Sequence, residues 1–369
     1  MQNWKFVLIG ITGDLAKRKI LPALGEFSNL FQDEVQIDLI GYSRSEPNVE
    51  EINQALNQKV SSRVRNITLE QGNYDDNKFF INLFNNQKDE RVIVYFAVPP
   101  HVFLDLLNTF CPFSNKHLDI IIEKPFGQDK NEALLILKKI EECKLGKNIH
   151  FCDHYLFKEG IIVNDSLKEI FSQNKNQIKL IKVKALEIVD INGRGGYYEG
   201  IGAIKDMIPA HFFSILATLC HALSKDINFD ELNVINVELG QYQGFLEHIQ
   251  KQESNIETYF KIKLLSQEGV AIEFESGKKL DRKETSIELG FRNGKNLYWR
   301  IDPNPQIVFG KKIIEQNTTS QSDHTRMLHD ILNNKNQLFL SPEDTIEGWN
   351  LYNKIVEFIS KNHPPLNVY

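Results

Sequence analysis

The stretch from Trp4 to Lys19, WKFVLIGITGDLAKRK, decides the fold of the first part of this chain. Its apolar opening predicts a buried strand, and Gly10 and Gly13 predict a tight turn directly after it. Apolar residues then recur at helical spacing from Ile20 to Phe27. A strand, a glycine turn and a helix in this order are typical of the first unit of a dinucleotide-binding fold, in which the turn brings backbone to a pyrophosphate at the helix N-terminus. The usual GxGxxG pattern is incomplete, so a glycine turn in another kind of α/β protein is the alternative.

The second predicted strand, Val35 to Gly41, bears on the choice of cofactor. An NAD site has an acidic residue after this strand to bind the ribose 2′-hydroxyl. Here Arg44 follows instead, and Lys19 on the first predicted helix adds a second cation. Because a guanidinium binds phosphate through two hydrogen bonds, the 2′-phosphate of NADP fits better. Glu46 follows closely and leaves NAD use open, and an ordinary surface role for Arg44 is the alternative.

Strands continue to alternate with helices up to about residue 152. The predicted strands are 92–98, 118–123 and 149–152, and the predicted helices between them are about 100–110 and 130–144. This alternation implies a parallel sheet with ligands at the carboxyl edge of its strands. Lys124 follows the strand 118–123, so we expect its side chain at that edge.

A polar cluster closes this half of the chain: Asp153, His154, Tyr155 and Lys158 follow one strand within a few residues. Imidazole, phenol and ammonium groups all donate hydrogen bonds, so three of the four suit an anion such as a phosphate. The carboxylate of Asp153 needs another role, most often the orientation of a histidine. The ordinary alternative is a strand end followed by a solvated helix start.

Strands dominate the second half of the chain. They are predicted at 179–188, 233–241, 256–264, 269–276, 284–292, 296–302 and 305–310, with helices at about 159–173, 204–219, 322–335 and 342–360. This pattern predicts a large, mostly antiparallel sheet packed on helices. The fold class is therefore α/β plus α+β, with a Rossmann-like domain over 1–152 and an α+β domain over 153–369.

Further candidate residues lie in this second half. Glu187 ends a predicted strand, while Asp206 and His211 belong to an apolar helix that Pro209 should kink. The segment Gly277–Lys283 predicts a cationic hairpin tip, either a charged turn that protects a sheet edge or a cap over an anion. The ordinary interpretation of a lone His211 is a buried core histidine.

Composition limits the classes of function. The chain has 369 residues, 41% of them hydrophobic, and a net charge of −6, which argues against broad nucleic-acid or membrane-surface binding. The four cysteines, Cys111, Cys143, Cys152 and Cys220, have no metal-binding spacing and predict buried thiols in a reducing compartment. With a start directly in a strand and no apolar run as long as a membrane span, we expect a cytoplasmic protein without a signal peptide.

Eight short motifs follow one another along most of the chain: GITGDLAKRK, GYSRS, YFAVPP, IIEKPFG, DHYLFKE, GRGGYYEGIGAIKDM with His211, GKKLDRKE and RIDPN. One of them alone is weakly specific, but eight in this order are very specific. Together they resemble the glucose-6-phosphate dehydrogenase family. The resemblance implies an enzyme that oxidises glucose 6-phosphate at C1 to 6-phosphoglucono-lactone with NADP, at the entry to the oxidative pentose phosphate pathway.

The same resemblance implies roles for individual residues. His211 would be the general base that takes the C1 hydroxyl proton, Asp153 would orient it, and Lys124 would contact both sugar and cofactor. The implied sugar and phosphate contacts are Lys124, His154, Tyr155, Lys158, Glu187, Asp206, Lys278, Arg282 and Lys283. The implied cofactor contacts are Gly10, Thr12, Gly13, Asp14, Leu15, Lys19, Arg44, Pro99 and Lys124. A homodimer or homotetramer is implied, built through the large sheet.

Departures from the family pattern leave room for a different substrate or role. The chain is shorter than usual members, Pro209-Ala210 replaces a Gln-Asn pair before His211, and Asp302 replaces a glutamine near the sugar. An added carboxylate could favour an amino sugar such as glucosamine 6-phosphate. The chain could also be a relative of glucose–fructose oxidoreductase, which needs no phosphate cluster, or a catalytically silent NADP-binding homologue.

Overall fold

The computed structural model describes residues 2–369 except 32, 57–63, 76–77, 86–89, 162, 164, 192, 194, 224–226, 315–320 and 336. The chain divides into two units: residues 1–157 with 321–342, and residues 158–320 with 343–369. The division therefore falls after residue 157, whereas we placed the boundary at 152. The segment 321–342 also belongs to the first unit, although we assigned it to the second domain.

The first unit contains a six-stranded sheet in the order β3-β2-β1-β4-β5-β6, and every pair of neighbouring strands is parallel. The strands are β1 (Gln2–Ile9), β2 (Val35–Ser43), β3 (Val64–Gln71), β4 (Arg91–Phe96), β5 (Leu118–Glu123) and β6 (Ile149–Cys152). All residues of β4 and β5 are buried, as expected for strands covered on both faces. The predicted Rossmann-like sheet is confirmed.

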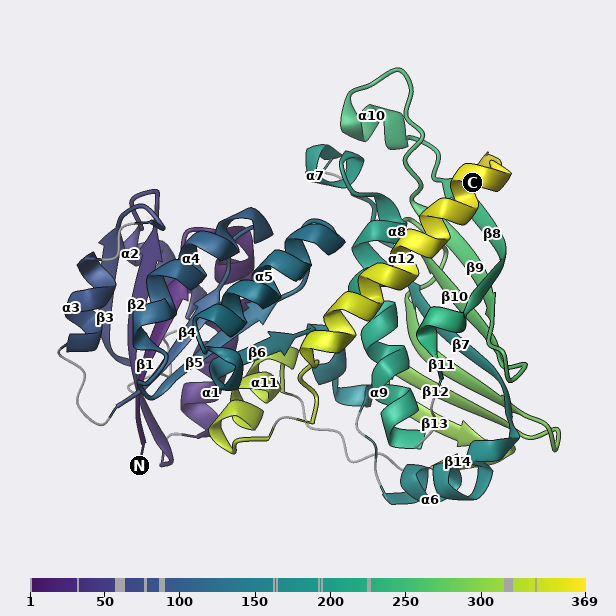
Figure 1. Cartoon of the computed structure of the whole chain (residues 1–369), viewed down its shortest axis with the longest axis horizontal. Helices are drawn as coiled ribbons and strands as arrows, with labels where there is room; N and C mark the ends of the chain where they lie inside the picture. Colours follow the sequence, from purple (N-terminus) through teal and green to yellow (C-terminus); the bar gives the residue numbers. More distant parts are fainter. Residues whose placement is uncertain are drawn as a thin grey trace. The chain divides into compact units, whose positions relative to one another are not determined.

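Helices cover this sheet (Figure 1). They are η1 (Ala16–Ile20), α1 (Leu21–Leu30), α2 (Val49–Ala55), α3 (Lys78–Asn85), α4 (Phe103–Phe110), α5 (Lys130–Glu142) and α11 (Asp323–Leu332). Helix α4 packs beside α5, and α1 packs beside α11. Each pair shields one part of the sheet from solvent.

Helix α11 belongs to the first unit because its residues bond to the sheet and to α1. Arg91 donates a hydrogen bond of 2.9 Å to the carbonyl oxygen of Ile331, and Thr325 donates one of 3.2 Å to that of Ala23. These partners lie 240 and 302 residues apart in the sequence. A local sequence pattern cannot reveal contacts between such distant residues. We therefore assigned the segment 321–342 to the second domain.

The second unit contains a nine-stranded sheet in the order β14-β13-β12-β11-β7-β10-β9-β8-β15. The strands are β7 (Ile178–Leu186), β8 (Asn233–Gln241), β9 (Tyr259–Leu265), β10 (Ala271–Gly277), β11 (Glu284–Phe291), β12 (Asn296–Asp302), β13 (Gln306–Phe309), β14 (Lys312–Ile314) and β15 (Leu366–Val368). Only the pairs β7–β10 and β8–β15 are parallel among these named strands. The predicted mostly antiparallel sheet is confirmed.

The helices of this unit are α6 (Asp165–Asn174), α7 (Gly195–Glu199), α8 (Gly202–Met207), η8 (Ile208–Phe212), α9 (Phe213–Leu223), α10 (Phe245–Ile249) and α12 (Pro342–Asn362). Figure 1 shows α8, α9 and α12 in front of the sheet. Alternate residues of β9, namely Phe260, Ile262 and Leu264, are buried, so one face of the sheet forms the core beneath the helices.

The segment from Lys278 to Lys283 is not the hairpin tip that we predicted. It connects β10 to β11, but β7 lies between these two strands in the sheet. The segment must therefore cross the end of β7, and it bonds there: Leu280 donates its N–H to the Glu187 carbonyl oxygen at 2.9 Å. This crossing brings the cationic segment beside the residue that follows β7.

The helical run Gly202–Leu223 changes geometry at Pro209, as predicted. Helix α8 ends at Met207, and the next five residues form the π-helical turn η8. Proline has no N–H to donate, so it disturbs the regular helical hydrogen bonds. Helix α12 packs close to this turn, because a Cβ placed on Gly348 would lie closer than 3.0 Å to the Pro209 carbonyl oxygen.

We expect Gly348→Ala to lower the free energy of unfolding by about 1–3 kcal/mol, because a backbone oxygen cannot rotate away from the added methyl group. Activity should fall as well, since the shifted turn η8 carries His211. Urea denaturation of the variant measures the loss of stability. The control is Gly196→Ala in α7, where an added Cβ meets nothing within 4 Å. Equal stability of both variants would contradict close packing of α12 on η8.

The run Gly202–Leu223 is also long and apolar enough, by length and composition, to cross a membrane. This differs from our expectation that no apolar run reaches that length. In the structure, 83% of its most apolar window is buried inside the protein. Its apolar residues therefore form the helical side of the second unit's core.

Two of the cysteines differ from the prediction of buried thiols. Cys111 and Cys143 form a disulfide, with Cα atoms 4.8 Å apart. Each follows the last residue of a helix, α4 and α5 respectively, and these helices lie side by side. Cys152 and Cys220 are buried free thiols, as expected.

Candidate active site

The glycine turn after β1 has the conformation that the sequence predicted. Gly10 has a φ of 86°, and its N–H donates to the Tyr42 carbonyl oxygen at 2.7 Å. A Cβ at Gly10 would lie closer than 3.0 Å to the carbonyl oxygen of Ala97. Only glycine fits here, because the turn is confined between the chain segments that leave β2 and β4. Gly13 donates its N–H back to the Gly10 carbonyl oxygen at 2.9 Å.

A pocket of about 460 Å³ opens beside this turn, lined by Thr12, Arg44, Ser45 and Tyr74. The hydroxyl oxygens of Thr12 and Ser45 are 2.8 Å apart, and the Arg44 guanidinium lies 5.4 Å from the centre of the Tyr74 ring. Burial raises the pKa of Tyr74, although the Arg44 charge opposes this. All four side chains can donate hydrogen bonds and none carries a carboxylate, so the pocket suits a phosphate group.

Four other predicted cofactor residues lie outside this pocket and differ in their exposure to solvent. Lys19 is exposed on η1, and Asp14 is exposed and forms an ion pair of 2.6 Å with Arg18. Leu15 is half-buried at the start of the same helical run, and Pro99 is exposed just before the next helix. None of these four lines the pocket at Arg44.

Sequence reasoning missed Tyr74. It follows β3, a strand that we did not predict, because the sequence VRNITLEQ lacks a continuous apolar run. Its aromatic ring beside Arg44 becomes visible only when β3 is placed next to β2 in the sheet.

Two predicted residues lie at the carboxyl ends of β5 and β6, at the ligand edge of the parallel sheet. Lys124 follows β5, and its N–H donates to the Cys152 carbonyl oxygen at 3.2 Å. Asp153 follows β6 and is fully buried, and its Oδ1 accepts the N–H of Tyr155 at 2.9 Å. His154 and Tyr155 begin the short helical turn η5 (His154–Phe157).

A buried carboxylate that the sequence analysis did not single out lies beside these residues. Glu123, the last residue of β5, accepts a hydrogen bond from His154 Nδ1 at 2.9 Å and a short one from the Tyr95 hydroxyl. His324 Nε2 of α11 lies 3.5 Å from Glu123 Oε2, the same oxygen that accepts the bond from Tyr95. Burial by itself would raise the pKa of Glu123, but hydrogen bonds and charge from His154 and His324 hold it well below its usual range. Glu123 is therefore ionised.

In the second unit, carboxylates gather around the phenol of Tyr198. Burial raises the pKa of Tyr198 well above its usual value, and the charges of Asp206, Glu257 and Glu187 raise it further. Lys278 forms a short ion pair with Glu187, and its ammonium lies 6.0 Å from the centre of the Tyr198 ring. The segment that crosses β7 thus brings a predicted cation and a predicted acceptor together.

Asp302 connects two more predicted cations in the second unit. Its carboxylate lies 3.4 Å from Lys158 Nζ and 2.9 Å from Lys283 Nζ. Burial would raise the pKa of Asp302, but these two ammonium groups lower it. Arg282 instead pairs with Glu284 at 3.1 Å. Because two lysines of this chain already hold the carboxylate, Asp302 gives little support to an amino-sugar substrate.

The candidate base His211 is 3% exposed and lies on η8 of the second unit. Asp206 is half-buried on the preceding helix α8. Asp153 belongs to the first unit, so its pairing with His211 stays a prediction. Within the motif GRGGYYEGIGAIKDM, residues Gly195–Glu199 form the short helix α7, while Arg194 lies outside the described residues.

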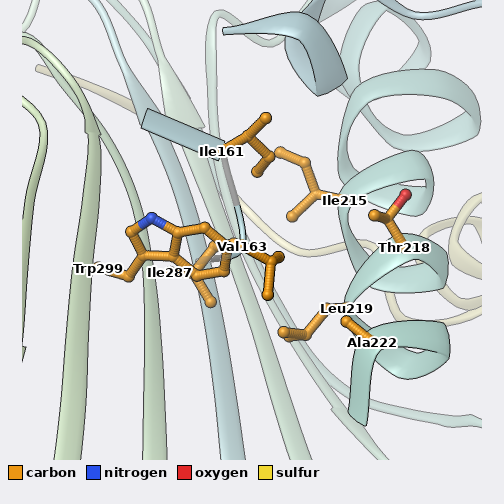
Figure 2. A pocket seen from close by; sticks show the side chains of 8 residues that line it. All are labelled: Ile161, Val163, Ile215, Thr218, Leu219, Ala222, Ile287 and Trp299. Carbon is orange, nitrogen blue, oxygen red and sulfur yellow. The ribbon is translucent and has the colours of Figure 1, made fainter. Parts of the chain in front are cut away.

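The second unit also contains a small cavity between α9 and the sheet (Figure 2). Its lining residues are Ile161, Val163, Ile215, Thr218, Leu219, Ala222, Ile287 and Trp299. At about 10 Å³ it has room for one water molecule at most, and all but Thr218 are apolar. It is a packing defect of the core and too small for a sugar.

Comparisons with protein families bear directly on this site. Residues 7–164 match the model described as "Glucose-6-phosphate dehydrogenase, NAD binding domain", and residues 162–239 match "Glucose-6-phosphate dehydrogenase, C-terminal domain". Glucose-6-phosphate 1-dehydrogenase of Aspergillus niger is 28% identical over 358 residues, covering 82% of this chain and 70% of the relative. That of Helicobacter pylori strain J99 is 24% identical over 412 residues, covering 100% and 96%. The chain is thus shorter than the fungal relative but close to the full extent of the bacterial one.

Solved structures agree with the fold. A glucose-6-phosphate dehydrogenase in complex with glucose-6-phosphate has a TM-score of 0.82 at 21% identity, covering 100% of this chain and 94% of that one. KijD10, a 3-ketoreductase from Actinomadura kijaniata bound to NADP, has a TM-score of 0.63 at 12% identity, with full coverage of both chains. The two-sheet architecture is therefore shared by enzymes with different substrates.

Proposed function

The chain belongs to the glucose-6-phosphate dehydrogenase family, and we propose that it oxidises glucose 6-phosphate at C1 to 6-phosphoglucono-lactone with NADP. The observation that carries this proposal is the match of both family models, in order, over residues 7–239. The donor-lined pocket at Arg44 and the cationic residues of the second unit supply the chemistry that such a reaction needs.

The first unit fits the dinucleotide. The backbone at Gly10 and Gly13 would approach the pyrophosphate, and Arg44, Thr12 and Tyr74 would hold the 2′-phosphate. When bound, NADP supplies an acceptor for the hydride that leaves C1. The donor set around Arg44 favours NADP over NAD, since the unphosphorylated ribose would leave the guanidinium without an anionic partner.

His211 would remove the C1 hydroxyl proton. Hydride cannot leave C1 while the hydroxyl keeps its proton, and an imidazole titrates near neutral pH. Asp153 would orient the ring and stabilise its cation, a role that suits a fully buried carboxylate at the end of β6. Lys124, at the end of β5, would contact both the sugar and the cofactor.

The sugar phosphate would be held both by hydrogen-bond donors, which bind its phosphate, and by carboxylates, which bind its hydroxyl groups. His154, Tyr155 and Lys158 would donate to the 6-phosphate, assisted by Lys283. Glu187 and Asp206 would accept hydrogen bonds from sugar hydroxyls. Lys278 holds the Glu187 carboxylate by an ion pair, so it would fix the direction in which that acceptor points.

Steady-state kinetics of the purified protein test the proposal. Nicotinamide reduction is followed with glucose 6-phosphate, glucose and glucosamine 6-phosphate, each with NADP and with NAD. We expect the highest kcat/KM for glucose 6-phosphate with NADP. Protein that binds NADP but turns over none of these sugars would contradict the proposal and favour the silent homologue. A preference for glucosamine 6-phosphate would restore the amino-sugar interpretation of Asp302.

We expect Arg44→Ala to raise KM for NADP by about 10–100-fold, because hydrogen bonds to a charged group contribute about 1.5–3 kcal/mol. KM for NAD should change little, so the ratio of the two values reports on the 2′-phosphate. Lys116→Ala is the control, since Lys116 is exposed, does not line the pocket and has no predicted role at the cofactor. An equal rise of KM for both cofactors in Arg44→Ala would place the 2′-phosphate elsewhere.

We also propose a homodimer or homotetramer in the cytoplasm. Support for assembly comes from apolar side chains exposed on strands and loops of the second unit, such as Ile235 at 54% and Ile188 at 55%. Support for the location comes from the sequence alone, and the Cys111–Cys143 disulfide counts against a reducing compartment.

A further inference from the structure

We propose that Glu123 is a positioning residue that gives His154 the protonation and orientation needed to bind the substrate phosphate. The inference rests on the proposed function, because it concerns the phosphate of that same substrate. It extends the site by three residues, Tyr95, Glu123 and His324, to which the motif resemblance gave no role. We call these residues together with His154 the Glu123 cluster.

The Glu123 cluster lies entirely within the first unit, and each member comes from a different element. Tyr95 belongs to β4, Glu123 ends β5, His154 begins η5 and His324 lies on α11. The side chains of Glu123 and His324 are each 5% exposed, whereas that of His154 is 27% exposed. His154 is therefore the member that a ligand can reach most readily.

The hydrogen bonds of the cluster fix the His154 ring. Its Nδ1 lies 2.9 Å from one oxygen of Glu123, and a carboxylate can only accept, so Nδ1 carries the proton of this bond. Tyr95 donates to the second oxygen, and His324 Nε2 lies 3.5 Å from that oxygen. The two imidazole rings are nearly parallel, with centres 5.8 Å apart. Two hydrogen bonds, from His154 and from Tyr95, thus fix the two oxygens of the carboxylate, and His324 lies close to one of them.

This arrangement determines how His154 can act. With Nδ1 engaged by Glu123, the ring can reach a phosphate only through Nε2. In the neutral ring that nitrogen would be an acceptor and would repel the phosphate oxygens, so binding requires a proton on both nitrogens. Glu123 places a buried carboxylate directly beside this ring, 2.9 Å from Nδ1. Glu123 would therefore act on the phosphate through His154, without touching the substrate.

The kinetic test is Glu123→Gln, which keeps the size of the side chain and an acceptor oxygen but removes the charge. We expect KM for glucose 6-phosphate to rise about tenfold or more with a small change in kcat. Turnover of unphosphorylated glucose, measured as kcat/KM, should stay within about twofold. In the double variant Glu123→Gln/His154→Ala, KM should rise no more than in His154→Ala alone, because both changes remove one interaction. Equal losses for both sugars, or effects that add, would overturn the proposal.

A second measurement is independent of turnover. Nitrogen chemical shifts of ¹⁵N-histidine-labelled protein, assigned with His154→Ala, report which ring nitrogens are protonated. We expect His154 to carry a proton on Nδ1 in the wild type, and on both nitrogens when inorganic phosphate or glucose 6-phosphate is added. A ring protonated only on Nε2 would overturn the proposal even if the wild type were inactive. Wild type without turnover but with the expected shifts would contradict the proposed function alone.

The loss of a buried charge can also disturb folding, so thermal unfolding and NADP binding are measured for each variant. If Glu123→Gln does not fold, Glu123→Asp replaces it, because the shorter side chain keeps the charge but draws it away from His154 Nδ1. We then expect the same rise of KM for glucose 6-phosphate, with kcat/KM for unphosphorylated glucose unchanged. A folded Glu123→Asp protein with the wild-type KM for glucose 6-phosphate would overturn the proposal.

Discussion

Replacing His211 with asparagine should lower kcat by about 10²–10⁴-fold while KM for glucose 6-phosphate changes little. Asparagine keeps much of the shape of the ring but cannot take a proton from the C1 hydroxyl. The substrate should still bind, since the predicted phosphate contacts lie on other residues. The measurement is steady-state turnover with NADP, together with binding of glucose 6-phosphate to the variant by calorimetry.

His221→Asn is the matched control for this variant. His221 lies on α9, in the same helical run as His211, but it is exposed. It should keep the activity and the thermal stability of the wild type. Wild-type kcat in folded His211→Asn protein would end the assignment of His211 as the base.

The pairing of His211 with Asp153 has its own readout. Asp153→Asn should lower kcat, and adding it to His211→Asn should cause little further loss, because the carboxylate acts only through the imidazole. If the fall in kcat of the double variant equalled the product of the two single falls, the two residues would act separately.

Replacing Lys158 with alanine should raise KM for glucose 6-phosphate by about 10–100-fold with a smaller effect on kcat. An ammonium hydrogen bond to a phosphate contributes about 1.5–3 kcal/mol, which corresponds to this range. The side chain of Lys158 is only 15% exposed, so solvent screens its charge weakly. Asp302 keeps Lys283 as a partner in the variant, so the change should leave no buried carboxylate unpaired.

A comparison of glucose 6-phosphate with unphosphorylated glucose shows whether Lys158 acts on the phosphate group. Turnover of unphosphorylated glucose should be the same in Lys158→Ala and the wild type. Lys168→Ala is the control, because Lys168 is 65% exposed on α6 and pairs with Asp165. If Lys158→Ala bound glucose 6-phosphate as tightly as the wild type, the phosphate would bind elsewhere.

Much of the fold follows from local sequence. Strands β5 and β12 begin and end at the predicted residues, Leu118–Glu123 and Asn296–Asp302, because apolar periodicity records which side chains are buried. Gly10 has the positive φ that the turn required, and Pro209 disturbs its helix as its missing N–H dictates. These features depend on neighbours along the chain, so the order of residues is sufficient to predict them.

The candidate site was accessible to sequence reasoning to a similar extent. Arg44 and Thr12 line one pocket, and Lys124 and Asp153 lie at the carboxyl ends of β5 and β6, while their roles stay predictions. Each belongs to a short motif with a physical requirement at a fixed spacing. Tyr74 was missed because β3 carries a weak strand pattern.

Only the tertiary structure decided which segments meet. The insertion of β7 between β10 and β11 turned an expected hairpin tip into a crossing that brings Lys278 to Glu187. Helix α11 packs in the first unit, and this packing places His324 beside Glu123. Apolar periodicity tells that a face is buried but not which distant segment covers it, since pairings across hundreds of residues leave no mark on the local order of one sequence. The sequence therefore determined the elements and the motifs, and tertiary packing decided the partners of their charged side chains.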